Sequence, residues 1–194
     1  MKQLILLLII SSISTNLFAQ SGCDNTTSFI IVNDLLNEIR QVYFPELQTI
    51  NISLKEFKSD AYFLQAQVDL DTLYKSKSKR KYFVEINPDI YSCSPNTKAL
   101  KAIIVHEMEH IKDYHSMSSA NIVALGIKYT SSKKFRARYE RATDEKALSK
   151  GQGLGLIDYR LWIYSKLTAK QLKLKKLYYL SPEEIQTWLE THSI

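Results

Sequence analysis

The chain has 194 residues, and its 26 Lys and Arg against 20 Asp and Glu give a formal net charge of +6 at pH 7. This length suits one domain with a substantial core, and no internal repeat or low-complexity linker divides it. No aromatic residues are interleaved in its basic clusters as stacking platforms, so the charge does not indicate a specific nucleic-acid partner.

The first residues have the organisation of an export signal. Lys2 is followed by an apolar run from Leu4 to Ile10, then by a polar stretch and a small residue, Ala19, at a position suited to cleavage. The run is much shorter than the roughly 20 residues of a membrane-spanning helix, and no later run reaches that length. We therefore predict a signal peptide at 1–19, a single domain at 20–194, no transmembrane segment, and export to the periplasm or the medium.

The first part of the domain predicts one helix and a small sheet. Apolar residues spaced three and four apart predict a helix over about 29–43 that Pro45 ends; they are Ile31, Leu35, Ile39 and Val42. Alternation and a high content of β-branched or aromatic residues then predict strands over 49–54, 61–68 and 81–86. Turn residues at 87–89 end the sheet.

Two lysine-rich tracts carry the excess charge. Residues 75–81 hold five cations in seven positions, and residues 170–176 hold four more. Such tracts can attract anionic surfaces such as lipopolysaccharide, membrane or nucleic acid. We prefer the simpler interpretation, a solvated turn and a solvated helix face.

After Pro95 the pattern is helical to the end of the chain. Helices are predicted over about 97–115, 119–128, 132–148, 156–167 and 169–179, with a last one from Pro182 through Trp188. The glycines at 151, 153 and 155 resemble a nucleotide-binding loop, but they follow a helix and not a strand. We interpret them as a helix stop and a tight turn. The predicted fold class is thus α+β, with a small mixed sheet over a helix and a helix-rich C-terminal half.

The chain has two cysteines, Cys23 and Cys93. An even number in an exported chain suggests a disulfide, which would tie the mature N-terminus to the approach of the helix at 97–115. Two buried thiols are the alternative. Cys23 could also be a lipid-anchor cysteine after Ser21 and Gly22, although Gln20 stands where such a signal has an aliphatic residue.

The segment His106–Glu107–Met108–Glu109–His110 carries the strongest functional signal. Residues four apart on a helix lie on one face, so His106 and His110 can both reach one ion at ~2.0–2.1 Å, the zinc–nitrogen distance. Glu107 can then take a proton from a water molecule that zinc acidifies. We also expect Ala99, Ala102 and Val105 to leave room around the site. The alternative is an ordinary helix with its polar residues on a solvent-exposed face.

A third ligand can come from the helix at 132–148. Glu140 and Asp144 lie four apart, so one carboxylate can bind the metal while the other accepts a hydrogen bond from the far nitrogen of a ligating imidazole. The alternative is a helix rich in charged residues on which both carboxylates are simply exposed. Glu145 points about 100° away from Asp144 around the helix. His115 follows His110 by five residues on the same short helix and would struggle to reach the ion. We expect it at the surface or at the rim of a pocket.

His106-Glu-x-x-His110, followed by Glu140-x-x-x-Asp144 and Ala147, resembles the gluzincin zinc metallopeptidases, especially the minigluzincins and the HtpX-type proteases. The similarity covers roughly 82–148, with Thr143 where HtpX-type sequences commonly have alanine. It implies a zincin-like fold with zinc on His106, His110 and Glu140. The same similarity implies that Glu107 is the base and acid and that Asp144 contacts a ligand without binding the zinc itself. It also implies that the strand at 81–86 forms the upper rim of the cleft and pairs with the substrate backbone.

These observations predict an exported zinc metallopeptidase with a peptide or protein substrate, which the strand at 81–86 would hold as an edge strand. Four residues are candidates for stabilising the oxyanion: Tyr139, His115, Tyr159 and Arg160. Two other functions remain open. One is a zinc-containing but inactive scaffold that binds a partner, and the other is a basic, non-enzymatic envelope protein.

Overall fold

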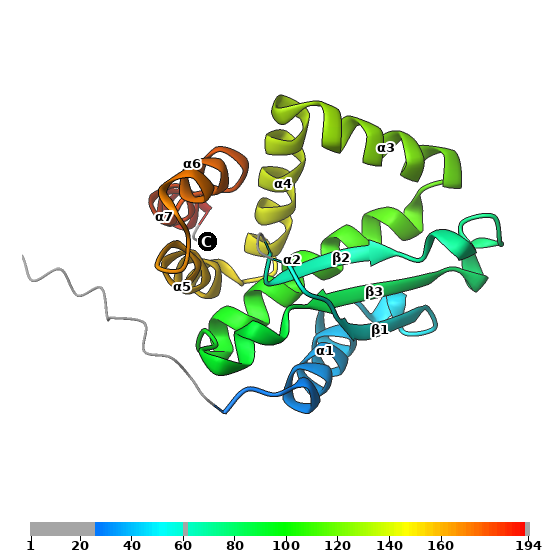
Figure 1. The fold of residues 1–194 in the computed structure, drawn as a ribbon, viewed down its shortest axis with the longest axis horizontal. Helices are drawn as coiled ribbons and strands as arrows, with labels where there is room; N and C mark the ends of the chain where they lie inside the picture. The colour runs from blue at the N-terminus through cyan, green and yellow to red at the C-terminus, as the bar shows by residue number, and fades with distance from the viewer. Residues whose placement is uncertain (1–25, 60–61, 193–194) are drawn as a thin grey trace, which may run out of the picture.

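The computed structural model describes residues 26–59 and 62–192, in which α-helices pack with a three-stranded mixed sheet (Figure 1). The α+β class is thereby confirmed. The predicted signal peptide lies outside the described residues. Within them, no helix combines the length and the apolar character needed to cross a bilayer.

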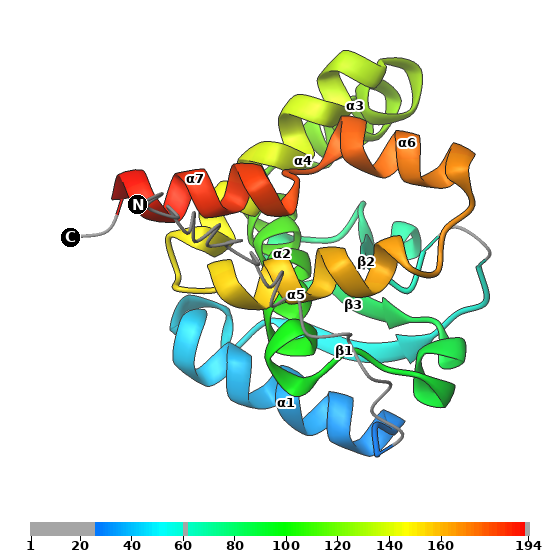
Figure 2. The same ribbon diagram turned by 90° about the vertical axis from the view of Figure 1, so that its left-hand side faces the viewer.

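The helices lie close to their predicted positions: α1 (Phe29–Tyr43), α2 (Thr97–Ser116), α3 (Ser119–Ser131), α4 (Lys133–Leu148), α5 (Gly153–Tyr164), α6 (Ala169–Tyr178) and α7 (Pro182–His192). The strands are β1 (Asn51–Glu56), β2 (Leu64–Val68) and β3 (Lys81–Ile86). Figure 2 shows α6 and α7 on the opposite side of the molecule from α1.

Helix α1 buries a face slightly rotated from the predicted one. Its core residues are Val32, Leu35, Leu36 and Ile39, whereas the expected contributors Ile31 and Val42 are exposed. Both sets have helical spacing in this apolar segment, so periodicity alone does not choose between them. The contacts of α1 with α2 and β1 decide which face is buried.

The order of the strands corrects one prediction. β1 pairs with β3 in parallel and β2 pairs with β3 antiparallel, which gives the order β1-β3-β2. The expectation that 81–86 forms an edge strand is therefore wrong, because β3 lies in the middle. β2, which follows β1 in sequence, pairs on the far side of β3 and is an edge of the sheet.

Helix α2 runs through the centre of the domain, in contact with β2, β3, α1, α4 and α5. The side chain of Asn96 caps its start by accepting a hydrogen bond from the backbone of Ala99 at 2.9 Å. From there to Ile111 almost every residue is buried, including the four polar residues of the 106–110 segment. An ordinary helix with these polar residues facing solvent is excluded.

Small residues bring α5 close to α2. A Cβ placed on Gly155 would lie 2.6 Å from the carbonyl oxygen of Lys98 and 2.7 Å from Cβ of Ala102. Ala102 thus allows the close approach of α5. Gly151, with a φ of 76°, ends α4 as predicted, but α5 already begins at Gly153. The glycine segment is part turn and part helix.

The first basic tract is only partly solvated. Its lysines are exposed, but Arg80 is buried, donating hydrogen bonds to the carbonyl of Met117 and to the hydroxyl of Ser119. Arg80 therefore ties the segment before β3 to the turn between α2 and α3. The expectation of a fully solvated turn is wrong at this residue.

Cys93 lies directly before the approach to α2, and it is not a free thiol. Cys23 lies outside the described residues, so the Cys23–Cys93 bond stays a prediction. Across a separation of 70 residues, the link is worth roughly 4 kcal/mol in the chain-entropy model. Intact mass with and without reductant tests it. Two thiols open to alkylation without reductant, or a lipid on the N-terminus, would contradict the bond.

Candidate metal centre

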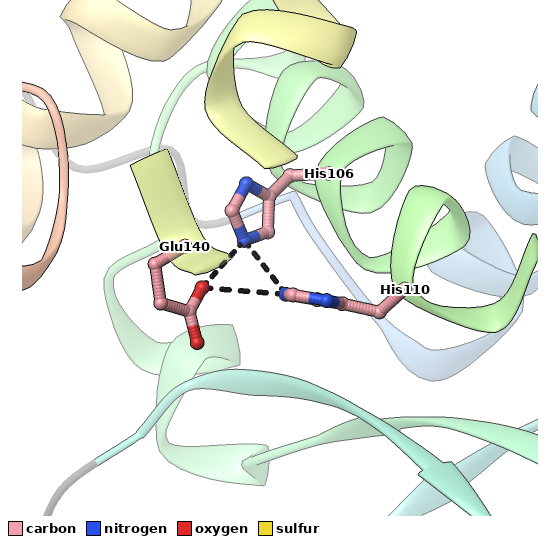
Figure 3. Close-up of side chains that lie close together, drawn as sticks. All are labelled: His106, His110 and Glu140. Atoms are coloured by element: carbon pink, nitrogen blue, oxygen red, sulfur yellow. Dashed lines mark hydrogen bonds and ion pairs between the residues drawn. The ribbon is translucent and has the colours of Figure 1, made fainter. Parts of the chain in front are cut away.

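Three buried side chains from two helices point toward one another (Figure 3). Nε2 of His106 lies 3.2 Å from Nε2 of His110 and 3.2 Å from Oε2 of Glu140. Nε2 of His110 lies 3.3 Å from the same carboxylate oxygen. The three donor atoms therefore form a nearly equilateral triangle.

This triangle fits a tetrahedral zinc ion. With bonds of ~2.0–2.1 Å, the corners of a tetrahedron around zinc lie about 3.3 Å apart. Two imidazoles and a carboxylate are also ligands that zinc accepts. A buried His/His/Glu group of this size could hold a metal ion, as the sequence predicted for these three residues.

The fold explains how the group assembles. His106 and His110 lie one turn apart on α2, and α4 packs against α2 and directs Glu140 at both imidazoles. Helix α3 leads the chain away from α2 before α4 returns (Figure 1). Glu145, which lies on the other face of α4, is exposed.

Asp144 contacts the imidazole of His106 on the side away from the other two donor atoms. Oδ1 of Asp144 lies 2.9 Å from Nδ1 of His106, the nitrogen that faces away from the other two donors. Arg160 of α5 donates to both oxygens of Asp144 at 2.7 and 2.9 Å, and the backbone N–H of Leu180 donates to Oδ2 at 2.9 Å. Such outer contacts orient a ligating imidazole and fix its tautomer. Asp144 lies where the sequence placed it, whereas the role of Arg160 was not foreseen.

The charges in the group are mutually stabilising. Burial lowers the pKa of His106, but the carboxylates of Asp144 and Glu140 outweigh burial and raise this pKa to about 10. Burial raises the pKa of Glu140, yet His110 and His106 hold it well below its usual range. Without metal, His106 therefore holds a proton at neutral pH. A metal ion that binds His106 must displace this proton, which couples metal binding to pH.

The second oxygen of Glu140 has its own partner. The hydroxyl of Tyr129, at the end of α3, donates a short hydrogen bond to Oε1. Burial and the charge of Glu140 raise the pKa of Tyr129 far above its usual value, so the phenol stays a donor. This contact fixes the carboxylate so that Oε2 faces the imidazoles. Nothing in the spacing of the sequence identified Tyr129.

Glu107 lies beside the triad and lines a cavity of about 640 Å³. Burial, the largest influence, raises its pKa above the usual range, while both imidazoles and the backbone of Ala66 on β2 oppose the shift. A carboxylate with a raised pKa is a better proton acceptor at neutral pH. The position suits the general base that the motif predicts.

The cavity is a groove between two walls. Edge strand β2 forms one wall, α3 forms the other, and Glu107, His110 and Tyr114 of α2 lie between them. Its lining also includes Tyr62, Tyr139 and Tyr179. The triad thus borders a groove large enough for part of an extended peptide.

Only one of the four oxyanion candidates lines this groove, namely Tyr139. Arg160 is buried against Asp144, and Tyr159 is buried in the core. His115 is not part of the group. Its Nδ1 lies 3.3 Å from the hydroxyl of Tyr82, away from the triad. Tyr179, which the sequence did not single out, lines the groove, with its ring centroid 5.9 Å from that of His106.

Comparison of the chain with protein-family models, with curated proteins and with solved structures finds no match.

Proposed function

We propose that the protein is a zinc-dependent peptidase whose site consists of His106, His110 and Glu140 as ligands with Glu107 as the base. The observation that carries the proposal is the triangle of donor atoms with sides of 3.2–3.3 Å beside Glu107 in an open groove. The resemblance of the motif to gluzincins supports the same chemistry.

The residues of the chain have distinct tasks in this reaction. Bound zinc would acidify a water molecule and polarise the peptide carbonyl. Glu107 accepts the proton of the attacking water and passes it to the nitrogen of the leaving amine. Asp144 and Tyr129 keep His106 and Glu140 in place. Tyr139 and Tyr179 are two of the tyrosines that line the groove, and their hydroxyls are candidates for stabilising the oxyanion.

Edge strand β2 is positioned to bind the substrate backbone. Among the described residues it pairs only with β3, and its residues Leu64–Val68 line the groove. An extended peptide can add to such an edge as a further strand. The substrate-pairing role that the resemblance assigned to 81–86 therefore passes to β2.

We expect protein purified under mild conditions to contain one zinc per chain, because three protein ligands and a water complete a tetrahedron. It should cleave an unfolded protein substrate, lose this activity with a chelator and regain it with zinc. Metal analysis and gel-based cleavage provide the measurements. Protein that takes up no zinc on dialysis contradicts the proposal. Tight zinc binding without any turnover would favour the inactive scaffold.

A further inference from the structure

A cation lies beside two tyrosines that line one end of the groove. Tyr62, just before β2, and Tyr179, just after α6, both line the groove. The ammonium of Lys175 lies 4.8 Å from the ring centroid of Tyr62 and 4.7 Å from that of Tyr179. Two aromatic faces therefore hold this cation at the end wall.

Lys175 corrects the prediction that the tract at 170–176 is a solvated helix face, because its side chain is half-buried. No ion pair or hydrogen bond joins its ammonium to a carboxylate among the described residues; the nearest negative influences are the more distant Glu140 and Glu107. Burial lowers the pKa of Lys175 to about 8, so the group is still mainly charged at pH 7. A partly desolvated charge without a close counter-ion is costly unless a ligand supplies one.

The neighbouring cations are already engaged. Arg136 donates to the hydroxyl of Tyr62 at 2.5 Å and stacks on the rings of Tyr129 and Tyr178. Arg160 is paired with Asp144. The contact between Arg136 and Tyr62 also joins the segment before β2 to α4. Of these three cations, Lys175 is thus the one that has no ion pair or hydrogen bond among the described residues, and its ammonium lies directly beside two tyrosine rings of the lining.

The distance from the triad to this cation is short. The ring of Tyr179 is close to both, 5.9 Å from the ring of His106 and 4.7 Å from the ammonium of Lys175, which limits the separation of the two groups. An extended chain advances ~3.3–3.6 Å per residue. Only about one to three residues of a substrate fit between the triad and Lys175.

We propose that Lys175 binds the C-terminal carboxylate of the substrate, so that the protein removes one to three residues from the C-terminus of peptides. The inference rests on the proposed peptidase function and specifies its substrate. Water adds across the peptide bond, leaving a new carboxylate on the longer product and a free amine on the released C-terminal fragment.

The polarity of this binding agrees with the sheet. β2 begins next to Tyr62, so a peptide whose C-terminus lies at Lys175 runs antiparallel to β2. Antiparallel addition is the stronger form of strand pairing. The preceding residues of the peptide then lie between β2 and α3, where Val123 and Ile127 present apolar side chains. We therefore expect apolar residues on the N-terminal side of the cleaved bond.

Binding of two labelled apolar peptides of identical sequence, one with a free C-terminal carboxylate and one amidated, tests the inference. The zinc-loaded Glu107→Gln protein holds them without turnover, and fluorescence anisotropy gives the affinities. We expect the free acid to bind about 10- to 100-fold more tightly, as a charge-assisted hydrogen bond implies. Adding Lys175→Met should abolish this preference, whereas Lys173→Met, on the exposed side of the same helix, should retain it.

The outcomes separate this inference from the proposed function. Equal binding of acid and amide, or a preference that survives Lys175→Met in protein with normal zinc content and thermal stability, overturns the role of Lys175. Mass spectrometry of the products of the wild-type protein gives a second measurement. Cleavage in the interior of both peptides at similar rates would retain the peptidase and refute the C-terminal preference. A protein that binds no zinc contradicts the peptidase itself.

Discussion

Replacement of Glu107 by glutamine is expected to lower peptide hydrolysis by about 10²–10⁴-fold while zinc content and fold are retained. The amide has the size of the carboxylate and keeps part of its hydrogen bonding, but it cannot accept a proton from water. Glu107 lines the groove beside the triad and is not one of the three grouped ligands, so the change leaves the metal donors intact.

The matched control for this substitution is Glu109→Gln. Glu109 is also buried on α2, but it lies toward Lys150 at 3.6 Å and does not line the groove. Its replacement removes a buried carboxylate without removing the base. Turnover of an unfolded protein substrate, zinc content and thermal unfolding are measured for both variants. A Glu107→Gln variant with wild-type turnover would show that Glu107 is not the base and would undermine the whole site assignment.

The positions of the helices could be predicted from local sequence patterns. The start of α2 at its Asn96 cap and the end of α4 at Gly151 both follow from residues whose chemistry favours helix termini. The order of the strands in the sheet could not be predicted from such local patterns. β3 is central because β1 and β2 pair on opposite sides of it, and such long-range pairing leaves no signature within any one strand.

The residues of the site likewise fall into those that the sequence predicted and those that it did not. Helical spacing predicted that His106 shares a face with His110 and Glu140 with Asp144, and the resemblance to gluzincins predicted that the two pairs meet. Tyr129 and Tyr179 were missed, and Arg160 was named only for another role. They come from α3, the residue after α6, and α5, respectively, and each reaches the site only through the packing of its helix.

Replacement of Glu140 by glutamine should cause the largest loss of metal affinity of any change on α4. Glu140 would be the only negatively charged ligand of a bound zinc ion, since ligating imidazoles are neutral, and its Oε2 faces both imidazoles at 3.2 and 3.3 Å. An amide oxygen lacks this charge and is a poorer zinc ligand. We expect severely weakened zinc binding, measured by competition with a chromogenic chelator, and loss of peptidase activity with it.

Three further variants rank the candidates. Asp144→Asn should weaken zinc binding about 10–100-fold, the loss that is typical when a hydrogen-bond partner of a metal-ligating histidine is removed. It also leaves Arg160 without its counter-ion, so thermal unfolding must be recorded beside affinity. Glu145→Gln changes an exposed carboxylate on the other face of α4, and His115→Ala removes the contact to Tyr82. Both variants should leave zinc affinity nearly intact. If His115→Ala lost the metal while Glu140→Gln kept it, the gluzincin-type ligand set would be wrong even for a zinc enzyme.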